Sequence, residues 1–340
     1  MDISVNKPNV NITYVNSERE FSLNNSIKID FSLLKRYTDE NKLAPNIIFV
    51  RTDYFDENDY FEMSVADPVK YSTTLEKAEK PLLFFAWNLF LQNNKNLTFE
   101  NLEFREGQLD IIVNALNRRH TIGLLPTGSG KSICYQLACF LQPAISFVVC
   151  PIKSLMVDQS QDLHNAYISR VNAVTSDNTA QEKQQVQWEY KQGKYFFIFI
   201  SPERFQIKKF RTYLSDINKH YNIAYAVIDE AHCMSEWGHD FRTSYLNLVY
   251  AIKLYCSNFS FIALSATASS NVLKDLRIEL NLDNEDDIKT PKEYCRKELE
   301  FYVINDKHNK YKALKELIMQ YKEDKFYGDK CGLIFTPTVN

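Results

Sequence analysis

The sequence predicts an α/β fold with a mostly parallel, doubly wound sheet, and three observations lead to that prediction. Short apolar runs without polar alternation recur from about residue 106 onward, which is typical of strands covered on both faces. Segments with apolar residues at helical spacing, or rich in charge and glutamine, separate these runs. A glycine-rich turn joins the first run to a helical segment. Alternating strands and helices of this kind form βαβ units and a parallel sheet.

The expected elements follow one another in a regular order. Apolar residues recur at helical spacing over 106–116, a strand is expected at 121–125, and a second helix at 132–141. Further strands are expected at 145–150, 195–200, 223–228 and 259–264. The charged segment 281–298 resembles a linker, and after it strands at 300–304 and 332–336 flank a helix at 310–321. This last group predicts the opening of a second α/β unit.

Three regions are predicted. Residues 1–98 form an accessory region of α+β character, with strand-like residues at 46–50 and a helix at 78–91, but no motif that assigns a role. Residues 99–285 form the main α/β lobe. Residues 286–340 hold the linker and the beginning of the second unit.

Composition limits the partners and the compartment. The 340 residues carry a formal net charge of −3, so contact with a nucleic acid must come from a local basic patch. Seven cysteines never occur as C-x-x-C, which favours reduced thiols in an intracellular protein over a zinc module. The N-terminus has no basic region followed by an apolar stretch, and the apolar run 82–91 is too short to span a bilayer. We therefore expect a soluble, cytoplasmic protein with no membrane partner.

The glycine-rich turn between the first strand and its helix predicts a phosphate-binding loop. Its residues are Thr127, Gly128, Ser129, Gly130, Lys131 and Ser132. Glycines allow successive amides to turn toward phosphate oxygens at a helix N-terminus. Lys131 would reach the β- and γ-phosphates and the Ser132 hydroxyl would bind Mg²⁺. The strict phosphate-loop pattern is not met, because Leu125 occupies its first glycine position. The alternative is a glycine-rich turn with an incidental lysine.

Two acids directly follow the strand expected at 223–228. The carboxyl ends of strands are where open α/β sheets bind ligands, so Asp229 is expected to hold Mg²⁺ and Glu230 to activate the attacking water. The alternative is that the two acids simply end a strand. His232 either links this site to the neighbouring sheet or is a hydrogen-bonded core histidine.

The stretch after the acid pair is rich in aromatic residues. Trp237, Phe241 and Tyr245, interleaved with His239 and Arg242, suit base stacking and phosphate contact on a single nucleic-acid strand. The alternative is that the aromatic residues are buried in the core at helical spacing.

Taken in order, these motifs resemble those of the RecQ DNA helicases of superfamily two. The matching segments are 104–108, 125–132, 148–159, 201–204, 229–242 and 264–268. The resemblance covers about residues 99–340 and implies a RecA-like P-loop NTPase domain, with the accessory region before it and the start of a second RecA-like lobe after it. The aromatic stretch after Asp-Glu-Ala-His is the most family-specific segment.

The resemblance also implies roles for single residues. Gln108 would bind the adenine edge and Arg105 would lie against the base of ATP. Where the family often has an aromatic residue before this arginine the chain has Asn101, so Phe99 or Phe104 would substitute.

Other residues would bind DNA or couple hydrolysis to movement. Lys153 and Ser154 match a segment that contacts the DNA backbone, and Trp237, Phe241 and Arg242 match the loop that couples strand binding to hydrolysis. Ser265 and Thr267, with His232, match the motif that links hydrolysis to movement between lobes.

The expected function is the ATP-binding lobe of an ATP-dependent DNA helicase. It would use ATP and Mg²⁺, drive 3′-to-5′ unwinding for DNA repair or recombination, and respond to single-stranded and partly duplex DNA. Residues 1–98 could bind a protein partner. The later second-lobe motifs, including an arginine that would complete the ATP site, are absent, so slow hydrolysis by this chain alone is expected. The alternatives are a nucleotide-dependent DNA-binding or regulatory module and an RNA-remodelling ATPase.

Overall fold

The computed structural model describes two compact units, residues 1–294 and 295–340. The residues described are 2–7, 10–15, 20–23, 27–30, 67–91, 101–142, 144–166, 168, 170–235, 242–245, 247–266, 269–282, 284–292, 302–305 and 309–323. The described part of the second unit contains helix α10 (Lys310–Glu323), which confirms the helix expected at 310–321.

The first unit is built around a seven-stranded sheet. Its strands are β5 (Thr121–Leu124), β6 (Ile145–Val149), β7 (Val171–Val174), β8 (Phe197–Ile200), β9 (Ile223–Ile228), β10 (Ser260–Ser265) and β11 (Ile288–Lys289). They lie in the order β11-β5-β10-β9-β6-β8-β7, and every neighbouring pair is parallel. The predicted α/β class with a parallel sheet is confirmed.

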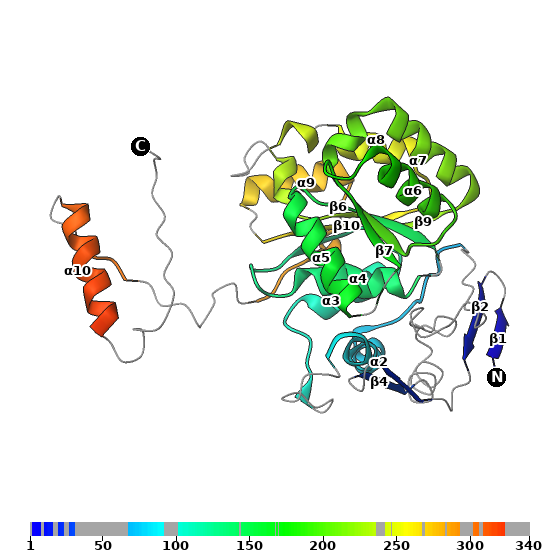
Figure 1. Ribbon diagram of the computed structural model, residues 1–340, viewed down its shortest axis with the longest axis horizontal. Helices are drawn as coiled ribbons and strands as arrows, with labels where there is room; N and C mark the ends of the chain where they lie inside the picture. Colours follow the sequence, from blue (N-terminus) through cyan, green and yellow to red (C-terminus); the bar gives the residue numbers. More distant parts are fainter. Residues whose placement is uncertain are drawn as a thin grey trace. The chain divides into compact units, whose positions relative to one another are not determined.

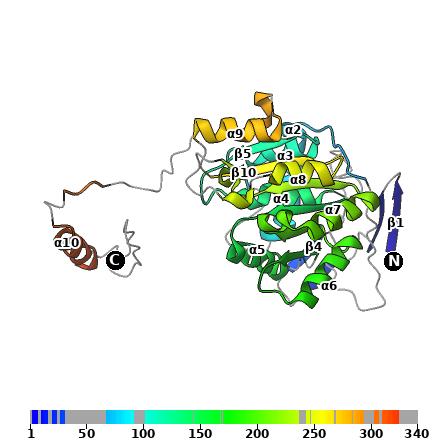
Figure 2. The ribbon, with the colours of Figure 1, turned by 90° about the horizontal axis from the view of Figure 1, so that it is seen from above.

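Helices cover both faces of the sheet, as Figure 1 shows. One face carries α2 (Leu75–Ala86), α3 (Gln108–Leu116), α4 (Lys131–Phe140) and α5 (Lys153–Asn165). The other carries α6 (Ala180–Lys191), α7 (Lys208–His220), α8 (Leu248–Tyr255) and α9 (Ser270–Leu280). Seen from above in Figure 2, α7 and α8 of the second face lie over the sheet. The sheet is therefore doubly wound, which explains why its strands are continuous apolar runs.

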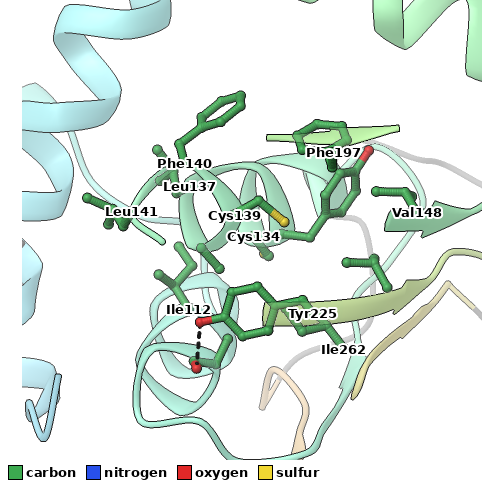
Figure 3. Close-up of a cluster of buried hydrophobic side chains, with 14 of the residues drawn as sticks. Ile112, Cys134, Leu137, Cys139, Phe140, Leu141, Val148, Phe197, Tyr225 and Ile262 are labelled. Atoms are coloured by element: carbon green, nitrogen blue, oxygen red, sulfur yellow. Dashed lines mark hydrogen bonds between the residues drawn. The ribbon is translucent and has the colours of Figure 1, made fainter. Parts of the chain in front are cut away.

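Two buried clusters alternate along the strands. Phe197 and Phe199 of β8 face the α3–α4 side, and Ile198 and Ile200 face the α7–α8 side. Tyr225 of β9 lies beside Ile112 and Ile262 (Figure 3), and its hydroxyl donates to the Ala115 carbonyl at 2.8 Å. A buried tyrosine hydroxyl needs such a partner.

The described segment that precedes α3 packs on the sheet unit. Val69 exchanges backbone hydrogen bonds with the Gln142 side chain, at 2.8 and 2.9 Å, and Tyr71 donates its amide to Leu116 at 3.0 Å. Ala78 and Leu82 of α2 are fully buried in the core. The helix expected at 78–91 is confirmed as α2, continued by the π-helix η2 (Trp87–Leu91). The region expected to be accessory thus contributes to the core of the lobe.

Some expected elements differ from the structure. Strands β7 and β11 were not predicted, and β11 lies inside the segment expected to be a linker, 281–298, where it pairs with β5. The strand expected at 300–304 is wrong where the structure describes it, because residues 302–305 adopt no regular structure and Tyr302 is 72% exposed. The strands expected at 46–50 and 332–336 lie outside the described residues. Two antiparallel hairpins, β1–β2 (Asp2–Lys7, Val10–Val15) and β3–β4 (Glu20–Leu23, Ile27–Asp30), are described in the N-terminal region.

Five described cysteines are buried thiols that form no disulfide among the described residues: Cys134, Cys139, Cys150, Cys233 and Cys256. Within the described ranges, no cluster of three or more histidine, cysteine or acidic residues suits a metal ion. No helix in this part of the chain is both long enough and apolar enough to cross a membrane.

Candidate active site

The glycine-rich loop joins β5 to α4 at the carboxyl edge of the sheet. Gly128 and Gly130 adopt positive φ values of 79° and 77°, which other residues rarely adopt. Gly130 caps α4 without a side chain, so the first amides of the helix point out of its end. A Cβ at Gly130 would lie 2.8 Å from the Gln108 Nε2 atom. This loop therefore has the backbone of an anion-binding helix N-terminus.

Gln108 holds this loop from the side. Its Nε2 donates to the carbonyls of Ser129, at 2.7 Å, and Gly130, at 3.2 Å, and its Oε1 accepts from the Arg105 amide at 2.9 Å. The Arg105 guanidinium donates to the Gly128 carbonyl. The two residues expected to bind the adenine base are thus hydrogen-bonded to the phosphate loop or to each other. Asn101 is exposed, Phe104 packs against the core, and Phe99 lies outside the described residues.

Strand order brings the acid pair beside the loop. Strand β10 lies between β5 and β9, and the amide of Leu125 donates to the Ser265 carbonyl at 3.0 Å. Glu230 follows β9, and its Oε1 lies 3.5 Å from the Lys131 Nζ atom. Residues about a hundred positions apart therefore meet at one edge, as the sequence predicted.

Glu230 is held between two cations. Its φ of 50° is unusual for a residue with a side chain, and its Oε2 lies 3.3 Å from the His232 Nδ1 atom. Burial favours a higher pKa for Glu230, but the hydrogen bond from His232 and the charge of Lys131 hold the pKa below its usual value. Hydrogen bonds with Cys233 and Glu230 raise the pKa of His232 to about 9. Glu230 is therefore ionised at neutral pH.

His232 also contacts the strand between the two halves of the site. Its Nδ1 atom lies 3.1 Å from the Ser265 Oγ atom. This contact joins η5 (Ala231–Met234) to the end of β10. The coupling role expected for His232 and Ser265 stays a prediction. Thr267 lies outside the described residues.

Asp229 is nearly buried, with 4% of its surface exposed. Burial, followed by the charge of Glu230, raises its pKa to about 6. The Gln159 side chain hydrogen-bonds to the Asp229 carboxylate. The Tyr245 hydroxyl donates to the Asp229 carbonyl at 3.3 Å. A buried carboxylate of this kind favours a cationic ligand, because burial penalises its charge.

A buried tyrosine connects the two residues expected to hold the metal. The Tyr135 hydroxyl donates to the Gln159 Oε1 atom and hydrogen-bonds the Ser132 side chain. Since a hydroxyl has one proton, it accepts from Ser132. The chain of bonds then runs from Ser132 through Tyr135 and Gln159 to Asp229. Sequence reasoning missed Tyr135 and Gln159, although Tyr135 lies three residues after Ser132 and so on the same side of α4.

The donor set fits Mg²⁺. The Ser132 hydroxyl donates a hydrogen bond to the Tyr135 oxygen and keeps its lone pairs for a cation, and the Asp229 carboxylate adds a second oxygen. Mg²⁺ prefers one or two such oxygen ligands together with phosphates and water. The Ser129 Oγ atom is buried and has no hydrogen-bond partner in the described part of the chain, so this loop has an unsatisfied polar atom beside the site.

The expected DNA-contacting residues are only partly described. Ser154 is exposed at the start of α5, and Lys153 forms an ion pair with Asp177. Arg242 Nη1 donates to the Pro151 carbonyl at 2.7 Å, which ties the end of the aromatic stretch to the end of β6. Tyr245 is buried. Trp237, Phe241 and His239 lie outside the described residues.

A phosphate loop after β5 and a carboxylate pair after β9, with only β10 between the two strands, define a P-loop nucleotide-binding domain. The DEAD/DEAH box helicase family matches residues 105–276, half of the chain, and the chain belongs to this family.

Curated relatives confirm the resemblance to RecQ helicases. The chain is 38% identical over 194 residues to "Probable ATP-dependent DNA helicase RecS" of Bacillus subtilis (strain 168), covering 57% of this chain and 38% of that protein. It is 32% identical over 241 residues to "ATP-dependent DNA helicase RecQ" of the same strain, covering 69% and 38%. It is 34% identical over 201 residues to "ATP-dependent DNA helicase Q1" of Mus musculus, covering 57% and 30%. The chain therefore spans less than half the length of each relative.

Among solved structures, the chain is similar to the helicase domain of Pyrococcus furiosus Hef. The match has 16% sequence identity and a TM-score of 0.44, and it covers 55% of this chain and 37% of that one.

Proposed function

We propose that this chain is the ATP-binding lobe of a RecQ-like helicase, which hydrolyses ATP in response to single-stranded DNA and drives 3′-to-5′ unwinding. The observation that carries the proposal is the ionised Glu230 carboxylate beside Lys131, at 3.5 Å. The direction of unwinding rests on the resemblance to RecQ helicases alone.

The proposed reaction is in-line attack of water on the γ-phosphorus of ATP. Glu230 orients the water and accepts its proton, and the bond from the γ-phosphorus to the bridging oxygen breaks, giving ADP and phosphate. Lys131 exchanges its contact with Glu230 for the β- and γ-phosphate oxygens, which frees the carboxylate to act as a base. The amides of Thr127, Gly128 and Gly130 would line the phosphates.

Ser132 and Asp229 would hold Mg²⁺, which neutralises charge on the phosphate oxygens when bound. Tyr135 and Gln159 keep these two ligands oriented through their hydrogen bonds. Gln108 and Arg105 would bind the adenine base, and their hydrogen bonds to the phosphate loop would couple base binding to the conformation of that loop.

DNA binding would be coupled to the nucleotide site through the contacts around β10. Lys153, Ser154 and the stretch that ends at Arg242 would bind the strand, and Trp237 and Phe241 would stack on its bases. His232, Ser265 and Thr267 would pass movement of that stretch to Glu230, since His232 contacts both Glu230 and Ser265.

Steady-state ATP hydrolysis by the full chain tests the proposal. We expect stimulation by single-stranded DNA and a fall of at least ~10²-fold in Glu230→Gln, the usual loss when a general base is removed. RNA of the same length and sequence should stimulate less. A rate indifferent to Glu230→Gln, or equal stimulation by RNA, would contradict the proposal; equal stimulation would favour an RNA-remodelling ATPase.

A further inference from the structure

The short helix η5, which follows the acid pair, is held at both of its ends. Near its start, the His232 Nδ1 atom lies 3.1 Å from the Ser265 Oγ atom of β10. Just after its end, the Ser235 hydroxyl donates a hydrogen bond to the Asp275 Oδ2 atom of α9 at 2.6 Å. Helix α9 is the element that follows β10 along the chain, so both anchors belong to one strand–helix unit. Asp275 lies outside every segment that carries the resemblance to RecQ helicases.

The bond between Ser235 and Asp275 has the features of a strong contact. Hydroxyl-to-carboxylate hydrogen bonds of about 2.5–2.7 Å are roughly twice as strong as bonds between neutral groups. Ser235 is 1% exposed, so water has little access to its side chain. A buried hydroxyl depends on partners within the protein, and Asp275 is therefore a fixed point for the end of η5.

Helix α9 gives Asp275 a firm support. Its side chains Val272, Leu276 and Leu280 are buried in the core under the sheet face that α9 covers. The Ser269 side chain caps the helix by accepting from the Val272 amide at 3.3 Å. Asp275 lies three residues after Val272, which places it on the same side of the helix. The hydrogen bond therefore fixes Ser235 to a packed helix.

The end of η5 is connected to the candidate general base. The Ser235 amide donates to the His232 carbonyl at 3.2 Å, and side chains three residues apart lie one above the other in a 3-10 helix. His232 in turn contacts Glu230, with 3.3 Å between Nδ1 and Oε2. A displacement of Ser235 can therefore reach Glu230 through a single helical turn.

The stretch expected to bind DNA begins where this anchor lies. Residues 236–241 follow Ser235 directly and are outside the described residues. After them the chain returns to η5, because the Arg242 amide donates to the Cys233 carbonyl at 3.2 Å. Whatever binds to this stretch acts on η5 from both ends of the stretch, and Asp275 determines how firmly the first end is held.

We propose that Asp275 is a positioning residue that holds the end of η5 on α9 and so lets strand binding after Ser235 change the setting of Glu230. Asp275 acts through Ser235 and touches neither the nucleotide nor the strand. The proposal rests on the proposed DNA-stimulated hydrolysis and adds to it the contact through which the stimulation is passed on.

The ratio of DNA-stimulated to basal ATP hydrolysis tests this role. The full chain is assayed with and without an oligothymidylate. A hydrogen bond to a charged group corresponds to about tenfold or more in an equilibrium constant, so Asp275→Ala should lower the ratio about tenfold, or to one if the wild-type ratio is smaller. Asp275→Asn keeps a carbonyl oxygen that accepts from Ser235 and should retain more of the stimulation. Adding Ser235→Ala to Asp275→Ala should change the ratio no further, because both substitutions remove the same bond.

Glu279→Ala is the matched control, because it removes an exposed carboxylate from the same helix. It should keep the wild-type ratio. Basal and stimulated rates that fall by the same factor in Asp275→Ala, or an Asp275→Asn ratio no better than that of Asp275→Ala, would show a structural role only and overturn the proposal.

Hydrogen exchange without nucleotide or DNA tests the anchor separately. The peptide that contains residues 231–235 should exchange about tenfold faster in Asp275→Ala than in the wild type, while peptides from β9 stay unchanged. Equal exchange in the two proteins overturns the anchor, and faster exchange with an unchanged ratio overturns its role in coupling. If the strand does not stimulate the wild type, the proposed function fails and the coupling role fails with it; faster exchange in Asp275→Ala would then distinguish this result from a missing anchor.

Discussion

Gln159→Leu tests whether the buried hydrogen bonds behind the acid pair position the metal ligand. The substitution removes the amide that bonds the Asp229 carboxylate and the acceptor of the Tyr135 hydroxyl, while keeping an apolar side chain of similar size. A hydrogen bond to a charged group contributes about 1.5–3 kcal/mol. Outer partners of metal ligands typically change metal affinity about tenfold to hundredfold. We therefore expect the Mg²⁺ affinity of the ATP complex to fall by about that factor.

The assay follows a fluorescent ATP analogue with the full chain, first in EDTA and then during a Mg²⁺ titration. Binding in EDTA should match the wild type, and the Mg²⁺ midpoint should move to higher concentration. Gln161→Leu is the control on the same helix, because Gln161 is exposed and bonds only Asn165 among the contacts described, at 3.0 Å. An unchanged midpoint, or an equal loss of affinity in EDTA, would refute the positioning role of Gln159.

Three further outcomes are expected. Tyr225→Phe should lower the free energy of unfolding by about 1 kcal/mol, because the Ala115 carbonyl, 2.8 Å from the hydroxyl, keeps the Arg118 amide but loses its second donor, and the Gln142 Nε2 atom loses an acceptor; denaturant titration measures this. His120 should make stability pH-dependent. Its Nδ1 accepts from the Phe261 amide at 2.9 Å, and burial, reinforced by the charge of Lys253, lowers its pKa below the ordinary 6.5. The contribution of His120 to the free energy of unfolding is then fully present above pH 6.5 and is lost as the pH falls below 6.5. The melting temperature of His120→Gln should therefore fall less on acidification than that of the wild type; equal slopes of melting temperature against pH would contradict this. Trp237→Ala should keep basal hydrolysis and lose stimulation by single strands, and unfolding of this variant would instead show that the side chain belongs to the core.

The strands that the sequence predicted are those whose local composition is enough to identify them as strands. Residues 223–228 are apolar along their whole length and 259–264 are apolar except for Ser260, because the sheet is covered on both faces; they form β9 and, shifted by one residue, β10. Strand β7 was missed, since its four residues include the polar Asn172. Strand β11 was missed because its two residues follow an acidic turn and gain their structure from pairing with β5.

The candidate site was predictable where chemistry is local to the motif. The glycines before Lys131 and the acids after β9 follow from backbone conformation and strand ends, and the structure brings Lys131 and Glu230 together. The contacts of Tyr135 and Gln159 were not predictable in the same way, because they depend on how α4 and α5 pack. Local sequence patterns do not determine how these two helices pack.

We propose that Lys131 and the amides at the start of α4 bind the phosphate tail of ATP opposite Asp229 and Glu230. The most direct measurement compares the affinities of the full chain for ATP and AMP in the presence of Mg²⁺. The wild type should prefer ATP, and Lys131→Ala should lose that preference, since charged hydrogen bonds of about 1.5–3 kcal/mol correspond to roughly tenfold or more in affinity. A preference that survives in Lys131→Ala, or a wild type that binds both nucleotides equally, would contradict this assignment of the site.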